Sequence, residues 1–375
     1  MRRSSFLILM FFSLWTVTDG AMPCIGKNGK PVDMYVLYKL PKIYWQDVPE
    51  YVKDGSAYAY LDNEDMEFTL SPTLITSPQS VAGLTLNQVY DAYENRATPS
   101  GQAHLFYNDA NLDINDDSYN SKWGHTKGAM AFDQQIGFWM IHSVPHFPDF
   151  AKNGYSYPSS GHKYGQMFFC MTLNSSAIND VGLQLRYNNP YVQDSFMPEE
   201  WNDKFPNIAA LLKGEIIDSD PYYHIQDFIS LGGMKLKSFA KGTKFNKDLY
   251  STLVAPTLKI NLLTETWQNG QGNLGSACNT SYTVEDVTNI KLDVPDGSYY
   301  AFRDTNDHSK YALSDTADNP YVCIGDINRQ TGQFKRGGGT VCTKNASLWK
   351  TFRGMVDDIN SCQNQDQFED IFDMI

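Results

Sequence analysis

Two short stretches, His125-Thr126-Lys127 and His308-Ser309-Lys310, repeat the pattern His-x-Lys in a chain that has only seven histidines. In an extended strand, residues two apart lie on the same face, so each imidazole would stand beside an ammonium group. That combination suits a phosphodiester, because lysine neutralises non-bridging oxygens while histidine attacks phosphorus or moves a proton. We expect the two stretches, which are remote in sequence, to lie together at one site. The fold would then have to bring the two parts of the chain that contain them side by side.

The residues that follow each pair extend the pattern. Asp315 completes HxKxxxxD after the second pair, and Gly325-Asp-Ile-Asn328 comes soon afterwards. The first pair has Asp133 one position late, and it has His142-Ser143 where a Gly-x-x-Asn would be expected. We expect His142 and Asn328 to help bind a phosphate or to orient an imidazole.

Hydrophobic patterning indicates a mixed fold. Short strand-like runs occur at 34–38, 103–107, 128–133 and 138–144, the last two joined as a hairpin by residues 134–137. Helical spacing links Leu348, Phe352, Met355, Val356 and Ile359, recurs at 368–375, and is expected over 198–213 with Leu211 and Leu212 facing inward. Strands and helices without a long linker predict an α/β or mixed α+β protein.

The chain divides most naturally in its middle. A stretch at 191–245 rich in Pro, Asn, Asp, Gly and Lys would connect an N-terminal half (22–190) to a C-terminal half (246–375), each with one His-x-Lys pair. The division predicts a pseudo-dimer of two sheet-containing halves within one chain.

Composition excludes a broad basic surface. The chain has 375 residues, 42% of them hydrophobic, which is enough for a sizeable core, and its net charge is −13. A polyanion would therefore have to bind at a local basic site, or at a pH where carboxylates and histidines carry extra protons. Arg329, Lys335 and Arg336 form either a basic loop that grips a nucleic-acid backbone or a solvated hairpin tip.

Residues 1–21 have the form of a secretory signal. Arg2 and Arg3 precede an apolar run from Phe6 to Val17, and small or polar residues follow it. This run is shorter than the roughly 20 residues that a membrane-spanning helix needs, and no other segment comes close, so no membrane span is expected. We expect an exported protein.

The cysteines fit that compartment. All six lie beyond the signal, and three disulfides are expected, although spacing alone leaves 15 pairings open. No cysteine or histidine spacing resembles a zinc site, and GxGxxG at 270–275 lacks a strand-to-helix setting, so neither a metal nor a nucleotide cofactor is expected. Glycosylation sequons begin at Asn174, Asn279 and Asn345.

The paired motifs resemble those of the phospholipase D superfamily, in which two copies meet across a pseudo-twofold axis. The resemblance to the deoxyribonuclease II (acid DNase) family is closer and runs through nearly the whole mature chain. It rests on GKPVD (29–33), YKLP (38–41), FYND (106–109), GHTKG (124–128), GFW (137–139), HSVP (142–145), HSK (308–310), GDINR (325–329) and GGGTVC (337–342).

The resemblance implies a lysosomal endonuclease that cuts double-stranded DNA at acid pH without a metal and leaves 3′-phosphate ends. It implies the disulfides Cys24–Cys170, Cys278–Cys362 and Cys323–Cys342, and clearance of DNA from dying or engulfed cells. His125 and His308 would be nucleophile and general acid in an order that the sequence leaves open, with Lys127 and Lys310 holding the phosphate. Oligomeric state and cut-site preference are also left open.

Three rival functions remain at this point. One is a phospholipase D-like lipid phosphodiesterase, another is a non-catalytic secreted DNA-binding glycoprotein, and the third is a metal-dependent nuclease. Two intact His-x-Lys pairs argue against the non-catalytic alternative. Secretion, in place of lysosomal delivery, is equally compatible with the signal.

Overall fold

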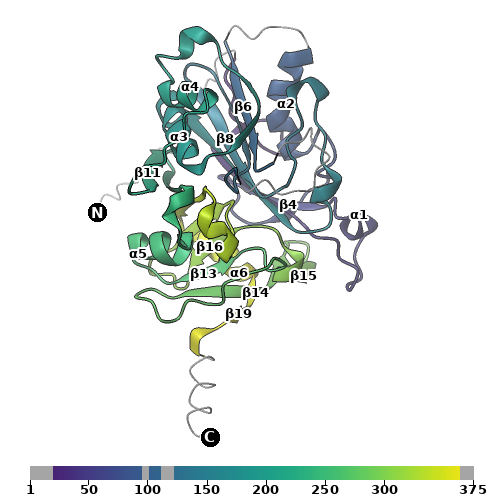
Figure 1. Ribbon diagram of the computed structural model, residues 1–375. Helices are drawn as coiled ribbons and strands as arrows, with labels where there is room; N and C mark the ends of the chain where they lie inside the picture. The colour runs from purple at the N-terminus through teal and green to yellow at the C-terminus, as the bar shows by residue number, and fades with distance from the viewer. Residues whose placement is uncertain (1–19, 95–100, 111–121, 364–375) are drawn as a thin grey trace, which may run out of the picture.

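The computed structural model describes residues 20–94, 101–110 and 122–363. The expected signal, up to residue 19, and the apolar spacing at 368–375 lie outside these ranges. Two large sheets form the frame, one in the upper and one in the lower part of Figure 1. The mixed fold with two sheet-containing halves is confirmed.

The first sheet has eight strands, and neighbouring strands are antiparallel throughout. In spatial order they are β10 (Tyr191–Phe196), β6 (Ala103–Asn108), β7 (Gly128–Phe132), β8 (Ile136–His142), β9 (Gln166–Asn174), β3 (Met34–Lys39), β4 (Tyr58–Asp62) and β5 (Thr69–Leu70). A separate short ribbon pairs β1 (Cys24–Ile25) with β2 (Pro31–Val32).

The second sheet has nine strands, with one parallel pair between β13 and β14. Its order is β11 (Tyr223–Ile229), β12 (Lys235–Lys241), β18 (Gly338–Lys344), β17 (Tyr321–Gly325), β16 (Tyr311–Ser314), β13 (Leu262–Glu265), β14 (Val284–Asp293) and β15 (Tyr299–Arg303), with β19 (Val356–Asn360) also on β14. The segment 191–245 therefore contributes β10 to the first sheet and β11 and β12 to the second.

Three apolar layers hold the sheets together. The central layer contains side chains of both sheets, together with residues of α3 (Ser175–Asn188), α4 (Pro206–Leu212) and α6 (Ala346–Met355). A second layer lies between the first sheet and α2 (Val81–Glu94), and a third lies between the second sheet and the segment that ends in α5 (Ala255–Leu258). The remaining helix is α1 (Glu50–Lys53).

Burial on both faces explains why the central strands read as continuous apolar runs. Every residue of β3 is buried: Met34, Val36 and Tyr38 enter the central layer, whereas Tyr35 and Leu37 enter the layer under α2. Such strands show no polar alternation, because each side of the sheet is covered. The membrane question has a limited answer: no helix within the described ranges is long and apolar enough to span a bilayer.

The expected strands are confirmed, and the two expected helices within the described residues are both shorter than the spans predicted for them. The hairpin forms between β7 and β8, and α4 covers the second half of the expected 198–213 helix. The spacing from Leu348 to Ile359, by contrast, is helical only as far as Met355. Residues 356–360 pair with β14 instead, because pairing with a neighbouring strand outweighs a helical period that continues by chance.

Two of the three sequon asparagines also begin helices. The side chain of Asn174 accepts a hydrogen bond from the amide of Ala177 at the start of α3, and Asn345 does the same for Leu348 in α6. Asn is among the preferred residues at this capping position because its oxygen satisfies a free helical amide. Asn279 is exposed in a loop before β14.

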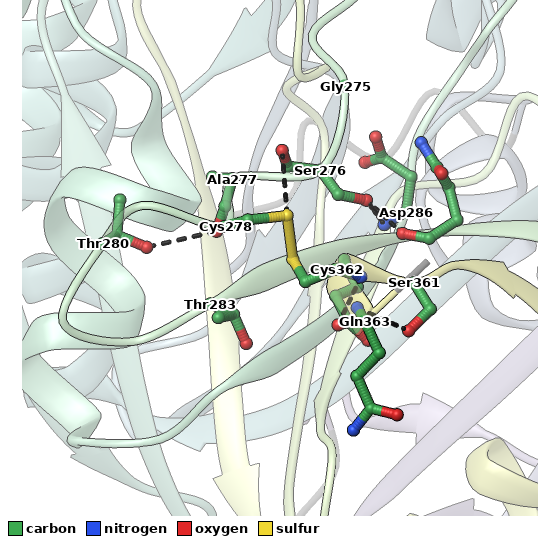
Figure 2. The surroundings of a disulfide bond; sticks show 12 residues. Gly275, Ser276, Ala277, Cys278, Thr280, Thr283, Asp286, Ser361, Cys362 and Gln363 are labelled. Carbon is green, nitrogen blue, oxygen red and sulfur yellow. Dashed lines mark hydrogen bonds between the residues drawn. A yellow bond between two sulfur atoms is a disulfide. The ribbon is translucent and has the colours of Figure 1, made fainter. Parts of the chain in front are cut away.

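The structure contains the three disulfides that the family resemblance implied: Cys24–Cys170, Cys278–Cys362 and Cys323–Cys342. Figure 2 shows the second, which joins the loop before β14 to the residue stretch after β19. Polar contacts flank it, including Ser276 Oγ donating to the Asn360 carbonyl at 2.5 Å and the Cys362 amide donating to Glu285 at 3.0 Å. The disulfide secures the end of the second sheet.

Candidate active site

Each His-x-Lys pair lies in an extended segment that leads directly into a central strand. Lys127 precedes β7 and Lys310 precedes β16. The two strands open matching units, because β7, β8 and β9 are neighbours in that order in one sheet, as are β16, β17 and β18 in the other. The subtle repeat in the sequence is therefore a structural repeat.

His125 is held by the backbone of the other half of the chain. Its amide donates to the carbonyl of Gly337 at 2.8 Å, and its Nδ1 lies 2.5 Å from the carbonyl oxygen of Asp326. Asp326 follows β17 and Gly337 precedes β18. The second half therefore orients the histidine of the first.

His308 is held in the reciprocal way. Its amide donates to the carbonyl of Gly165 at 2.9 Å, and its Nδ1 lies 2.9 Å from the carbonyl oxygen of Ser143. Ser143 follows β8 and Gly165 precedes β9, which are the matching positions in the first half. The side-chain oxygen Oε1 of Gln166 lies 3.2 Å from the same Nδ1 of His308.

These contacts determine the tautomer of both imidazoles. A backbone carbonyl only accepts hydrogen bonds, so Nδ1 carries the proton in His125 and in His308. The lone pair of each neutral ring then lies on Nε2. Both rings therefore keep Nε2 for chemistry, either as a nucleophile when neutral or as a proton donor when charged.

A buried carboxylate, Asp109, joins two cations, Lys127 and Arg336, beside His125. One of its oxygens lies 2.9 Å from Lys127 Nζ, 3.6 Å from Arg336 Nη2 and 3.7 Å from His125 Nε2. Only 3% of Asp109 is exposed. Although burial alone would raise the pKa of Asp109, Lys127 and Arg336 together lower it below its ordinary value, so this group is an anion.

The middle residue of each pair also has a function. Thr126 donates its hydroxyl to the carboxylate of Asp326, and Ser309 donates to the carboxylate of Asp307 at 2.6 Å. Both carboxylates are buried. The Thr126 hydroxyl therefore ties the first pair to the other half of the chain. The Ser309 contact is local, and Asp307 in turn accepts a hydrogen bond from Tyr38 in β3.

The two pairs lie close enough to interact electrostatically. Burial lowers the pKa of His125 well below its usual value, and the charges of Lys127, Arg336 and Lys310 lower it further. Burial, Lys310 and Lys127 act on His308 in the same direction. Burial and the charge of Lys127 also lower the pKa of Lys310 to about 7. The structure thus brings His125, Lys127, His308 and Lys310 into one cationic cluster.

Of the two supporting residues expected from the sequence, His142 lies close enough to the cluster for the charge of Lys127 to act on it. His142 ends β8 and is fully enclosed between Phe147 and Phe168, and burial together with Lys127 lowers its pKa to about 3. It is therefore neutral. Asn328 is buried, and its side-chain oxygen has no hydrogen-bond partner among the described residues.

The two aspartates that follow the pairs have local structural roles. Asp133 accepts hydrogen bonds from the amides of Gln135 and Ile136 and so shapes the β7–β8 turn. Asp315 accepts one from Asn261. Each lies at the far end of the strand that begins beside its lysine, so neither contacts an imidazole.

The expectation for the glycine-rich basic segment is wrong for two of its three residues. Arg329 is buried and ion-paired with Asp248 and Asp286, so it neither grips a nucleic acid nor lies at a solvated tip. Arg336 is also buried and donates to the carbonyls of Trp123 and Gly124. Only Lys335 is exposed.

Sequence reasoning missed Asp109 and Arg336 as members of the site. The FYND motif that contains Asp109 was a signal of family resemblance, but nothing in the spacing related it to a histidine. The sequence left Arg336 either in a basic loop that grips a nucleic acid or at a solvated hairpin tip, and neither alternative buries it beside a histidine. The buried carboxylates of Asp326 and Asp307 were likewise adjacent to noted motifs without being assigned a partner.

The fold and this site define a mixed α/β protein in which two sheet-containing halves each contribute one His-x-Lys pair. Comparison with known proteins specifies the family: the Deoxyribonuclease II profile matches residues 23–362, and the chain belongs to the deoxyribonuclease II family. It is therefore a nuclease of the deoxyribonuclease II type.

Curated relatives agree over nearly their full length. Deoxyribonuclease-2 of Caenorhabditis elegans is 35% identical, with 95% of this chain and 98% of the relative covered. Deoxyribonuclease-2-alpha of Rattus norvegicus is also 35% identical, with the same coverage. Plancitoxin-1 of Acanthaster planci is 34% identical over 96% of this chain and 99% of its own.

Proposed function

We propose that the protein is an acid endodeoxyribonuclease that hydrolyses double-stranded DNA to 3′-phosphate and 5′-hydroxyl ends without a metal. The observation that carries the proposal is the reciprocal hold on the two histidines. Each Nδ1 is bound to a carbonyl of the opposite half, so Nε2 is the ring nitrogen left for the substrate in both, with an Asp109 oxygen 3.7 Å from that of His125.

The first chemical step forms an N–P bond and breaks the P–O5′ bond. Neutral His125 attacks phosphorus through Nε2, while protonated His308 gives its Nε2 proton to the leaving 5′ oxygen. Lys127 and Lys310 neutralise the non-bridging oxygens. His125 is assigned as the nucleophile by analogy with the phospholipase D superfamily, and the opposite assignment uses the same atoms.

The second step restores the enzyme. Neutral His308 takes a proton from water, the oxygen of that water attacks phosphorus, and the N–P bond breaks to release the 3′-phosphate. His125 recovers its lone pair. We assign Asn328 and His142 to binding the phosphate or orienting an imidazole, as their positions in the sequence suggest.

The electrostatics of the cluster support action at acid pH. The mechanism needs one imidazole neutral and the other protonated, and burial with nearby lysines lowers the pKa of both. Protonation of one ring therefore requires acid. A bound phosphate then favours the charged ring, since an anion within reach stabilises an imidazolium.

Asparagine substitutions give a sharp test. In His125→Asn and His308→Asn the side-chain amide keeps a donor near Nδ1 but removes Nε2, whereas His146→Asn alters an exposed histidine as a control. At about pH 5 with chelator present, plasmid nicking should fall by at least about 100-fold in the first two variants, the range for loss of an acid or base. Full activity in either variant would refute the mechanism.

The same assay separates the rival functions. Loss of wild-type nicking in chelator would point to a metal-dependent nuclease. Hydrolysis of phosphatidylcholine without cleavage of DNA would favour a lipid phosphodiesterase. DNA binding without hydrolysis of either substrate would favour a non-catalytic glycoprotein.

We also propose delivery to the lysosome, with secretion as the alternative, and a role in degrading DNA of apoptotic or engulfed cells. The apolar start, the sequons and the low imidazole pKa values support this location. One C. elegans relative, 33% identical to this chain, is named Cell-death-related nuclease 7. Fractionation of expressing cells, with the activity assayed in lysosomes and in medium, tests the location.

A further inference from the structure

The two halves differ at one pair of matched positions beside the histidines. Strand β6 pairs with β7, and β13 pairs with β16, in the same register relative to the His-x-Lys segments. The residue after each lysine pairs with Tyr107 in β6 or with Glu265 in β13. Two residues further along, the first half has Asp109 and the second has Trp267. The Trp267 ring lies 4.9 Å from the His308 ring, whereas a carboxylate oxygen of Asp109 lies 3.7 Å from His125 Nε2.

Trp267 belongs to a row of rings that leads away from His308. Tyr164 lies edge-to-face with Trp267, with ring centroids 4.4 Å apart, and Trp267 lies edge-to-face with His308. Lys163 Nζ lies 4.7 Å from the centroid of the Tyr164 ring. In an edge-to-face pair one ring contributes only its edge, so its faces stay available for stacking.

This row is accessible, unlike the rest of the site. Trp267 and Tyr164 are half-buried and Lys163 is exposed, whereas Asp109 and Lys127 on the opposite side are buried. The side of the site near His125 therefore offers charge, and the side near His308 offers aromatic surface. A nucleotide strand that crosses the site meets two chemically different neighbours.

The backbone holds both rings in place. The buried amine of Lys39 donates to the carbonyls of His162 (2.8 Å) and Tyr164, and the next residue, Gly165, accepts the His308 amide. Gln330 donates to the carbonyl of Trp267 at 3.1 Å. Main-chain anchoring leaves the side chains themselves for contact with a ligand.

We propose that Trp267 and Tyr164 form a stacking platform for the nucleobase next to the scissile phosphate, and that Lys163 binds the phosphate of the following nucleotide. The inference rests on the proposed nuclease function. Every base has a flat aromatic face, so stacking tolerates any sequence and suits an enzyme that degrades DNA generally. The platform also gives the strand a direction, because only one side of the phosphate has it.

The test uses one oligonucleotide with two tracts, one carrying bases and one abasic, so that product lengths report cleavage in each. The variants are Trp267→Ala, Trp267→Phe and Tyr164→Ala, with Trp45→Ala as a control at an exposed tryptophan remote in sequence from both rings. Wild-type protein should cut the base-bearing tract faster. Trp267→Ala should lose about 5- to 150-fold in kcat/KM on that tract, which corresponds to about 1–3 kcal/mol of stacking.

Specificity for the base is what distinguishes the platform from a structural role. Trp267→Ala should cut the abasic tract within about twofold of wild type, Trp267→Phe should recover most activity, and Tyr164→Ala should show a smaller loss confined to the base-bearing tract. Equal losses on both tracts in Trp267→Ala and Tyr164→Ala, or no loss in either, would overturn the platform. Cleavage of neither tract by wild type would instead overturn the nuclease function.

Discussion

Replacing Asp109 by Asn removes one charge from the centre of the site without changing its shape. Asp109 and Lys127 form an ion pair of 2.9 Å with side-chain exposures of 3% and 2%, and Arg336 lies 3.6 Å from the same oxygen. The substitution leaves two buried cations without their counter-ion. Breaking a buried pair in this way costs about 3–5 kcal/mol of the free energy of unfolding.

A matched control exists at the surface. Asp293 pairs with Lys291 at 3.1 Å, almost the same distance, but the exposures are 63% and 39%. Exposed pairs contribute about 0–1 kcal/mol, so Asp293→Asn should change stability little. Both variants are compared with wild type by equilibrium urea unfolding at pH 7, with tryptophan fluorescence as the signal and the disulfides intact.

The difference between wild type and Asp109→Asn should also depend on pH. The folded-state pKa of Asp109 is lowered, so its contribution is complete above the unfolded value of about 3.8 and is lost as pH falls through the folded value. The full penalty should therefore persist at pH 5 and shrink only in stronger acid. A double variant, Asp109→Asn with Lys127→Met, should lose less free energy of unfolding than the two single variants lose in sum.

An Asp109→Asn variant that unfolds within about 1 kcal/mol of wild type at pH 7, as Asp293→Asn is expected to do, would refute the reasoning. It would mean that water or a rearranged side chain neutralises Lys127 and Arg336. The Asp109 carboxylate would then not be needed to stabilise the two cations.

Three further outcomes are expected. Lys310→Gln removes a charge that lowers the pKa of both histidines that we propose as catalytic. The pH at which nicking declines should therefore move upward even as the rate falls, while exposed Lys335→Gln leaves the profile unchanged. Burial raises the pKa of Glu265 well above its usual value, so wild type should lose stability as pH rises through the folded pKa. In thermal scans, Glu265→Gln should therefore be more stable than wild type near pH 8 but not near pH 4. Replacing Cys278 and Cys362 by Ser opens a link between residues 84 positions apart and should lower the free energy of unfolding by about 2–5 kcal/mol in urea titration.

Local patterns predicted local structure well. The apolar runs at 34–38 and 128–144 became β3 and the β7–β8 hairpin, because strands buried on both faces have a direct signature in composition. The same logic failed beyond Met355, where apolar residues continued at helical spacing but paired with β14. An apolar spacing that repeats over a few residues does not show whether a strand lies close enough in the fold to pair with that segment.

The site was predictable in its chemistry but not in its contacts. The two His-x-Lys pairs were visible because the residue types repeat, and their positions before β7 and β16 follow from the same repeat. Asp109 and Arg336 come from the two different halves of the chain, 227 positions apart, and only the folded arrangement of both sheets brings them together. Arg329 shows the converse error, since a basic residue in a glycine-rich segment was buried by two aspartates.

The reciprocal hold on the histidines makes the two halves interdependent. Each half supplies a complete His-x-Lys pair, yet the carbonyl that sets the tautomer of each imidazole belongs to the other half. A separated half would keep its residues but lose the hydrogen bonds that present Nε2. The near-symmetry of the two halves gives both imidazoles the same backbone contacts. Their neighbours differ, because Asp109 lies beside His125 and Trp267 lies beside His308. In the mechanism that we propose, that difference lets one imidazole act as nucleophile while its counterpart acts as acid on a strand of defined direction.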